Sequence, residues 1–129
     1  MTRLLLDTHA WAWTAVADEL LTRRAVRAIS EADEVFISSV SLYEIGQKVR
    51  LGKWPEMAPV VDRIWDVLEE QGTIVVPLDA EMAVEAAGDP WPHRDPFDRL
   101  IAATARHLGA TMVTADRMLA SAPGIRVLW

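Results

Sequence analysis

Short apolar runs alternate with amphipathic stretches along the whole chain. The apolar runs are rich in leucine, valine and isoleucine, which predicts buried strands. The expected strands are 3–6, 35–37, 73–77, 111–114 and 125–128. The stretches between them repeat their apolar residues about every 3.6 positions, which predicts helices. This alternation favours an α/β fold whose parallel sheet is covered on both faces.

Glycine, proline and serine mark where the helices should begin and end. The expected helices are 10–16, 20–29, 60–71, 80–87, 98–108 and 115–121. A further helix, capped by Ser39 or Ser41, should end at Gly52. Residues 88–96 contain three prolines and predict a loop.

The composition is that of a folded globular protein. The chain has 129 residues, 51% of them hydrophobic and 25% charged, and it shows no internal repeat or long linker. We therefore expect one domain over residues 1–129. There is no cysteine, which excludes a disulfide framework, a thiolate zinc site and a cysteine nucleophile. The apolar run at the N-terminus is too short for a membrane span, and we expect a cytoplasmic protein.

The formal net charge is −6. Simple nucleic-acid binders are usually basic, because contacts to phosphate supply most of their affinity. The acidity therefore argues against that class. It is compatible with an enzyme whose acids are partly neutralised by bound cations, and it favours a basic partner.

Four acids stand near the predicted ends of strands. Asp7 ends the first strand, and Glu44 lies on the helix after the second. Asp98 begins the helix after the proline-rich loop, and Asp116 follows the fourth strand by two residues. Because parallel strands present their carboxyl ends at one edge of the sheet, these side chains can meet in one cleft.

Clustered carboxylates would repel one another, and some would take up protons. A hard divalent cation such as Mg²⁺ or Mn²⁺ removes that penalty, since it prefers carboxylate and water oxygens. Such a site can activate water and stabilise the leaving oxygen of a phosphodiester. The chain has 19 acids, so their spacing alone does not single out this chemistry.

Each of the four acids also has a structural explanation. Asp7 can be a turn residue, and Asp98 can be an acid favoured by the helix dipole or a partner of Arg99. Glu44 can complete a capping box that begins at Ser41. Asp116 can cap its helix, a role that does not exclude metal binding.

Four motifs occur in an order that adds to this evidence. Together they resemble the PIN-domain nucleases, especially the VapC-type toxins of bacterial toxin–antitoxin pairs, over essentially the whole chain. The motifs are Leu4-Leu5-Leu6-Asp7-Thr8-His9, the segment from Ser39 to Ile45, the segment from His93 to Ala103, and Val113-Thr114-Ala115-Asp116. The run from Arg50 to Lys53 also looks like that subgroup.

The resemblance implies a three-layer α/β/α sandwich around a mostly parallel sheet. It also implies cleavage of RNA with Mg²⁺ or Mn²⁺, inhibition by a cognate antitoxin, and a homodimer. By motif position, the catalytic and metal-binding acids would be Asp7, Glu44, Asp98 and Asp116.

Several other polar residues near these motifs have predicted supporting roles. Asp95 precedes Pro96, which disfavours a helical conformation, so it is expected to cap the helix or to support the metal ligands. Thr114 is expected to hydrogen-bond an acid or to position a water. Arg94 and Arg99 are candidates for phosphate contact.

The three histidines, His9, His93 and His107, lack the spacing of zinc ligands. We expect structural or surface roles for them, with His93 the best candidate for a contact to RNA.

Two other function classes stay open from the sequence. One is a catalytically silent PIN-like module that acts only through a protein partner. The other is a phosphoryl-transfer or receiver-like domain in which Asp7 is phosphorylated. One phosphatase signature needs a second aspartate two residues later, and that position holds His9.

Overall fold

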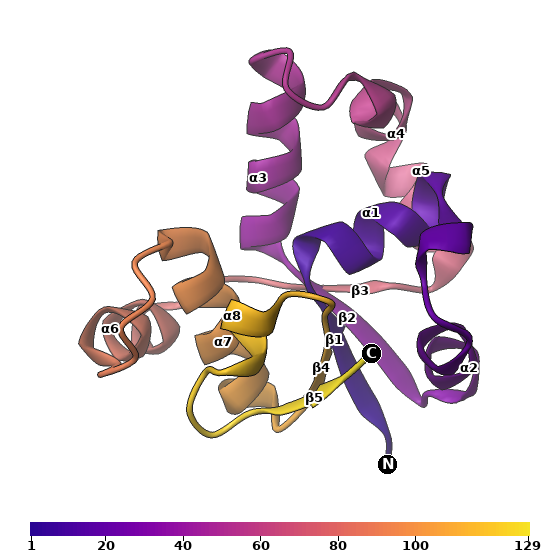
Figure 1. The fold of residues 1–129 in the computed structure, drawn as a ribbon. Coiled ribbons are helices and arrows are strands. Elements are labelled where there is room, and N and C mark those ends of the chain that lie inside the picture. The colour runs from indigo at the N-terminus through magenta and orange to yellow at the C-terminus, as the bar shows by residue number, and fades with distance from the viewer.

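A sheet of five parallel strands forms the middle of the computed structural model, which describes all 129 residues (Figure 1). The strands follow the order β3-β2-β1-β4-β5. Leu6 at the end of the central strand pairs with Ile37 on one side and Val113 on the other. The strands are β1 (Arg3–Leu6), β2 (Glu34–Ser38), β3 (Ile74–Val76), β4 (Thr111–Val113) and β5 (Arg126–Leu128). All five predicted strands are confirmed within two residues at each end.

Helices cover both faces of the sheet, which confirms the predicted three-layer α/β/α architecture. They are α1 (Thr8–Val16), α2 (Arg23–Glu31), α3 (Ser39–Arg50), α4 (Ala58–Asp62), α5 (Ile64–Gln71), α6 (Ala80–Gly88), α7 (Pro96–Leu108) and α8 (Arg117–Ala120). Two short 3₁₀ turns, η1 (Asp18–Leu20) and η2 (Pro55–Met57), complete the connections. No helix combines the length and the apolar character that a membrane span requires.

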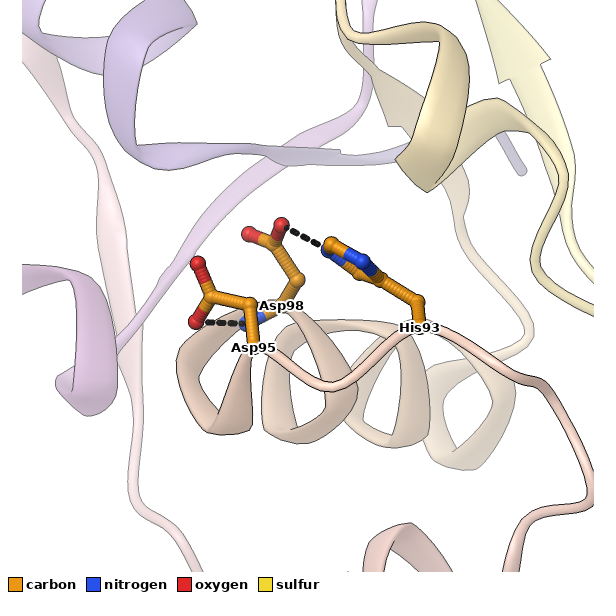
Figure 2. A group of neighbouring side chains, drawn as sticks. All are labelled: His93, Asp95 and Asp98. Carbon is orange, nitrogen blue, oxygen red and sulfur yellow. Dashed lines mark hydrogen bonds and ion pairs between the residues drawn. The ribbon is translucent and has the colours of Figure 1, made fainter.

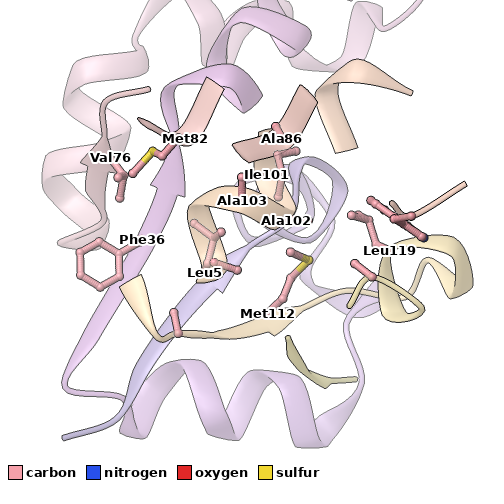
Figure 3. Packing of buried hydrophobic residues seen from close by; sticks show 14 residues of the cluster. Leu5, Phe36, Val76, Met82, Ala86, Ile101, Ala102, Ala103, Met112 and Leu119 are labelled. Carbon is pink, nitrogen blue, oxygen red and sulfur yellow. The ribbon is translucent and has the colours of Figure 1, made fainter. Parts of the chain in front are cut away.

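The strand β1 divides its leucines between two hydrophobic cores. Leu5 packs with residues of α6, α7 and α8, such as Met82, Ile101 and Leu119 (Figure 3). Leu4 and Leu6 point to the opposite face and pack with residues of α1 to α5. Because side chains alternate across a strand, a continuous apolar run serves both layers.

The predicted helix 60–71 is in fact two helices, so that prediction was wrong at its centre. Arg63 leaves the helical conformation, with φ −123° and ψ 29°, and separates α4 from α5. The apolar residues on both sides of the break, such as Val60 and Leu68, still face the same core. The hydrophobic period therefore continues through the break, and the sequence pattern does not reveal it.

Candidate functional site

A small polar cleft of about 130 Å³ lies at the carboxyl edge of the sheet. It brings together all five acids discussed above, from four separate segments of the chain. The lining residues are Asp7, Thr8, His9, Glu44, Lys48, Asp95, Asp98, Asp116 and Leu119.

Asp7 is the most deeply placed of the acids that the cleft collects, at the junction of β1 and α1. It is 5% exposed and caps α1, with Oδ1 accepting the Ala10 backbone N–H at 2.7 Å. Its other oxygen, Oδ2, accepts the hydroxyl of Thr114 at the end of β4. Burial raises the pKa of Asp7 above its usual 3.8, although both hydrogen bonds and nearby His9 oppose that rise.

Glu44 reaches the cleft from the second turn of α3. Its Oε1 accepts the Thr8 hydroxyl at 2.7 Å, and its Oε2 accepts the Lys48 ammonium at 2.9 Å. The helix is capped by Ser38, whose hydroxyl accepts the Val40 N–H at 3.1 Å. The capping role considered for Ser39 or Ser41 was therefore wrong, and with it the capping-box explanation of Glu44.

Asp98 lies in the first turn of α7 and is held by His93. Its Oδ2 is 2.6 Å from Nε2 of His93, and Figure 2 shows the imidazole directed at that oxygen. Burial raises the pKa of Asp98 to about 6, against the effect of the His93 hydrogen bond and with a further contribution from the charge of Asp95.

Asp95 caps α7 in the extended conformation that Pro96 imposes. Its Oδ1 accepts the Phe97 N–H at 2.9 Å. It also accepts, more weakly, the Asp98 N–H at 3.5 Å (Figure 2). Asp95, His93 and Asp98 each offer one possible ligand atom, and these atoms all lie within 4.8 Å of one another. Asp95 thus both caps α7 and lines the cleft.

Asp116 caps the short helix α8. Its Oδ1 accepts the Met118 N–H at 2.8 Å and the Leu119 N–H at 3.4 Å. Both bonds use the same oxygen, so Oδ2 is left for another ligand. The backbone N–H of Asp116 donates to the Thr114 hydroxyl at 3.0 Å, and Thr114 therefore connects Asp116 to Asp7.

Arg99 is not among the residues that line the cleft, and its role as a phosphate contact stays a prediction. Its guanidinium donates to four backbone carbonyl oxygens, one near the end of α6 and three in the proline-rich segment between α6 and α7. These belong to Ala86, Asp89, Trp91 and His93. With these contacts Arg99 fixes the loop that carries His93. Arg94 is exposed and keeps its predicted role as a candidate for phosphate contact.

Two further residues, Lys48 and His9, line the cleft although the sequence did not predict them there. Lys48 follows Glu44 by four positions, a spacing that places the two side chains on the same helix face. His9 follows Asp7 by two positions and lines the cleft from the start of α1. The i, i+4 spacing could have indicated Lys48, whereas the position of His9 depends on where α1 begins.

The donor set suits a hard divalent cation. Five carboxylates share one small cleft, and burial already raises the pKa of Asp7 and Asp98. A cation with oxygen ligands would stabilise the ionised forms that burial disfavours. The single ammonium lining the cleft, that of Lys48, neutralises only one of these charges.

Comparisons with known proteins agree with this arrangement. A family model described as PIN domain matches residues 4–125. The chain is 31% identical over 121 residues to Ribonuclease VapC22 of Mycobacterium tuberculosis (strain ATCC 25618 / H37Rv), covering 94% of this chain and 92% of that protein.

The fold is similar to those of two solved complexes. One is VapBC2 from Rickettsia felis bound to a DNA fragment from their promoter, with a TM-score of 0.72, 16% identity, and coverage of 98% of both chains. The other is DNA-bound VapBC from Salmonella typhimurium, with a TM-score of 0.70, 22% identity, and coverage of 99% of this chain and 98% of that one.

Proposed function

This chain belongs to the PIN-domain family, and from that premise we propose that it is a metal-dependent endoribonuclease, the toxin of a toxin–antitoxin pair. The observation that carries the proposal is the convergence of five carboxylates from four chain segments in one cleft. A relative named as a ribonuclease, similar over almost the full length of both chains, supports it.

A cognate antitoxin is part of the same proposal. The solved structures with a similar fold include VapBC complexes. The net charge of −6 and the acidic cleft favour a basic segment in such a partner. The homodimer and the cytoplasmic location expected from the sequence stay predictions, and light scattering of the purified protein would test the first.

We assign the metal to Asp7, Glu44, Asp98 and Asp116, with Mg²⁺ or Mn²⁺ as the ion. When bound there, such an ion would supply Lewis-acid chemistry that activates water and stabilises the leaving oxygen of the phosphodiester. Asp95 would add negative charge at the edge of the site and fix the start of α7.

The chain's own residues prepare the acids for this role. Thr114 and the Ala10 N–H hold the two oxygens of Asp7, and His93 holds Asp98. Lys48 and Thr8 hold the two oxygens of Glu44. Fixed carboxylates need little rearrangement during the reaction, which is the main advantage of a preorganised polar site.

Cleavage assays on protein freed of antitoxin test the proposal. We expect cleavage of single-stranded or looped RNA with Mg²⁺ or Mn²⁺, and no cleavage with a chelator. Asp7→Asn and Asp98→Asn should each abolish cleavage, whereas Asp66→Asn, at an exposed acid on α5, should leave it unchanged. Full activity in both cleft variants would refute the assignment. Absence of metal binding in calorimetry would favour the silent module instead.

A further inference from the structure

A chain of aromatic side chains begins at His9 in the acidic cleft and continues beside it, and we propose that these side chains bind an unpaired RNA base next to the phosphodiester that is cleaved. This inference rests on the proposed ribonuclease function and specifies how its substrate is held. We call the group formed by His9, Trp13, Trp54 and Trp129 the aromatic shelf.

The shelf begins inside the cleft itself. His9 lines the cleft, is exposed to solvent, and follows Asp7 by two residues. Its ring centroid lies 4.9 Å from that of Trp54, with an angle of 31° between the ring planes. The ring centroid of Trp13 lies 5.9 Å from that of His9, and the ring centroid of Trp129 lies 5.6 Å from that of Trp13. The shelf therefore continues from the cleft to the surface beside α1.

Core packing accounts for only part of these rings, since Trp54 and Trp129 pack against the edge of the second core and stay partly open to solvent. Trp11, on the same helix, is fully buried and donates its indole N–H to Gln71 at 2.9 Å. Trp13, Trp54 and Trp129 are only partly buried, and His9 is exposed. Three separate segments of the chain thus bring partly exposed aromatic side chains next to His9, which itself lines the mainly polar cleft.

The chemistry of the shelf fits an unpaired nucleotide. Bases in single-stranded RNA present π-faces that stack on histidine and tryptophan side chains. Lys48 adds a positive charge between the shelf and the acids, because its Nζ is 5.5 Å from the Trp54 ring centroid and 2.9 Å from Glu44. A base on the shelf would place its phosphate toward the cleft, where Lys48 offsets part of the negative charge.

Fluorescence anisotropy with two probes tests the base contact separately from catalysis. The probes are a labelled single-stranded oligoadenylate and an abasic oligonucleotide of equal length, both measured on proteins carrying Asp98→Asn to prevent cleavage. Adding His9→Ala should weaken binding of the oligoadenylate by roughly tenfold and leave binding of the abasic probe unchanged. His9→Phe keeps a ring for stacking and should restore the affinity.

Two matched controls lie outside the shelf. His107→Ala removes an exposed histidine in the last turn of α7, and Trp65→Ala removes an indole on α5 that is 71% exposed. Both should keep the affinity of the Asp98→Asn parent.

The possible results separate this inference from the proposed function. Equal oligoadenylate binding with and without His9→Ala would overturn the shelf, even where the wild type cleaves RNA. Equal losses for His9→Phe and His9→Ala would also overturn it, because the ring nitrogens and not stacking would then be responsible. The predicted pattern of binding in a protein whose wild type cleaves no RNA would support the shelf and refute the nuclease.

Discussion

The hydroxyl of Thr114, at the end of β4, donates a hydrogen bond to Oδ2 of Asp7, at the end of β1. Both side chains are at most 5% exposed, so the bond replaces water as the partner of a buried carboxylate. The bond connects the carboxyl ends of two neighbouring strands, β1 and β4, beside the cleft. The position of the most buried acid in the site thus depends on a residue 107 positions later.

Removing the hydroxyl should weaken both the fold and the site. Thr114→Val keeps the shape of the side chain and leaves Oδ2 of Asp7 without its donor. We expect a loss of about 1–3 kcal/mol in the free energy of unfolding, measured in urea without metal. We expect Mn²⁺ affinity to fall by about 10- to 100-fold in calorimetry, as for partners of metal ligands in general. Thr111→Val, at the start of the same strand, is the control, and equal effects of the two variants would contradict this role.

The pH dependence of metal-free stability should report on Asp98. Folding raises its pKa from 3.8 to about 6, so the folded state binds its proton more tightly than the unfolded state. The contribution of Asp98 to stability is therefore present at low pH and is lost as the pH rises from about 4 to about 6. Unfolding in urea across this range should show the loss in the wild type.

Asp98→Asn isolates that contribution from those of the other acids. The free-energy difference between this variant and the wild type should change across the same range and level off above it. A difference that stays constant from about pH 4 to about pH 7 would show that burial does not raise the pKa of Asp98.

Lys48 should stabilise the metal-free protein more than the metal-bound protein. Lys48→Met leaves the buried carboxylate of Glu44 without its ammonium, and the expected loss is about 1–3 kcal/mol without metal. Saturating Mn²⁺ should reduce this loss, because the ion takes over the neutralisation of Glu44. Thermal unfolding with and without Mn²⁺ measures both values. Lys53→Met, at an exposed lysine, should have no effect in either condition, and a loss at Lys48 that is unaffected by Mn²⁺ would argue against Glu44 as a ligand.

Arg99 should control the order of the loop beside the site. Arg99→Lys cannot reach the four carbonyl oxygens that the guanidinium contacts, since an ammonium has three donors on a single atom. We expect a loss of about 2–3 kcal/mol in the free energy of unfolding, with faster hydrogen exchange in residues 89–95. Cleavage should also fall, because His93 is held by the same loop.

Arg94 provides the contrast to Arg99. Arg94→Ala should leave stability and hydrogen exchange unchanged and should raise KM, as expected for an exposed phosphate contact. Similar destabilisation by both arginine variants would mean that the assignment of roles to the two residues is wrong.

The sequence predicted the strands and the acids because both follow local rules. A short apolar run followed by Asp7 defines a buried strand and its end without knowledge of the neighbours. Pro96 likewise restricts Asp95 to an extended cap, as the structure has it. The strand order and the break at Arg63 depend on contacts between distant segments. A local sequence pattern does not contain information on such contacts.

The sequence also could not predict which groups the side chains of Arg99 and His93 contact. Arg99 and Asp98 are adjacent in sequence, but consecutive residues of a helix point in different directions. One therefore enters the cleft while the other turns to the loop carbonyls. His93 approached Asp98 only because that loop folds back over the start of α7 (Figure 2).

The strand order has a consequence for a protein made from its N-terminus. Of the five strands, β1 is made first and is the central strand of the finished sheet, and one of its two neighbours, β4, begins only at Thr111. Asp7 obtains its partner Thr114, and the cleft obtains Asp116, only once β4 and the segment that follows it have been translated. A nascent chain that has not yet reached Asp116 therefore cannot hold the complete set of acids.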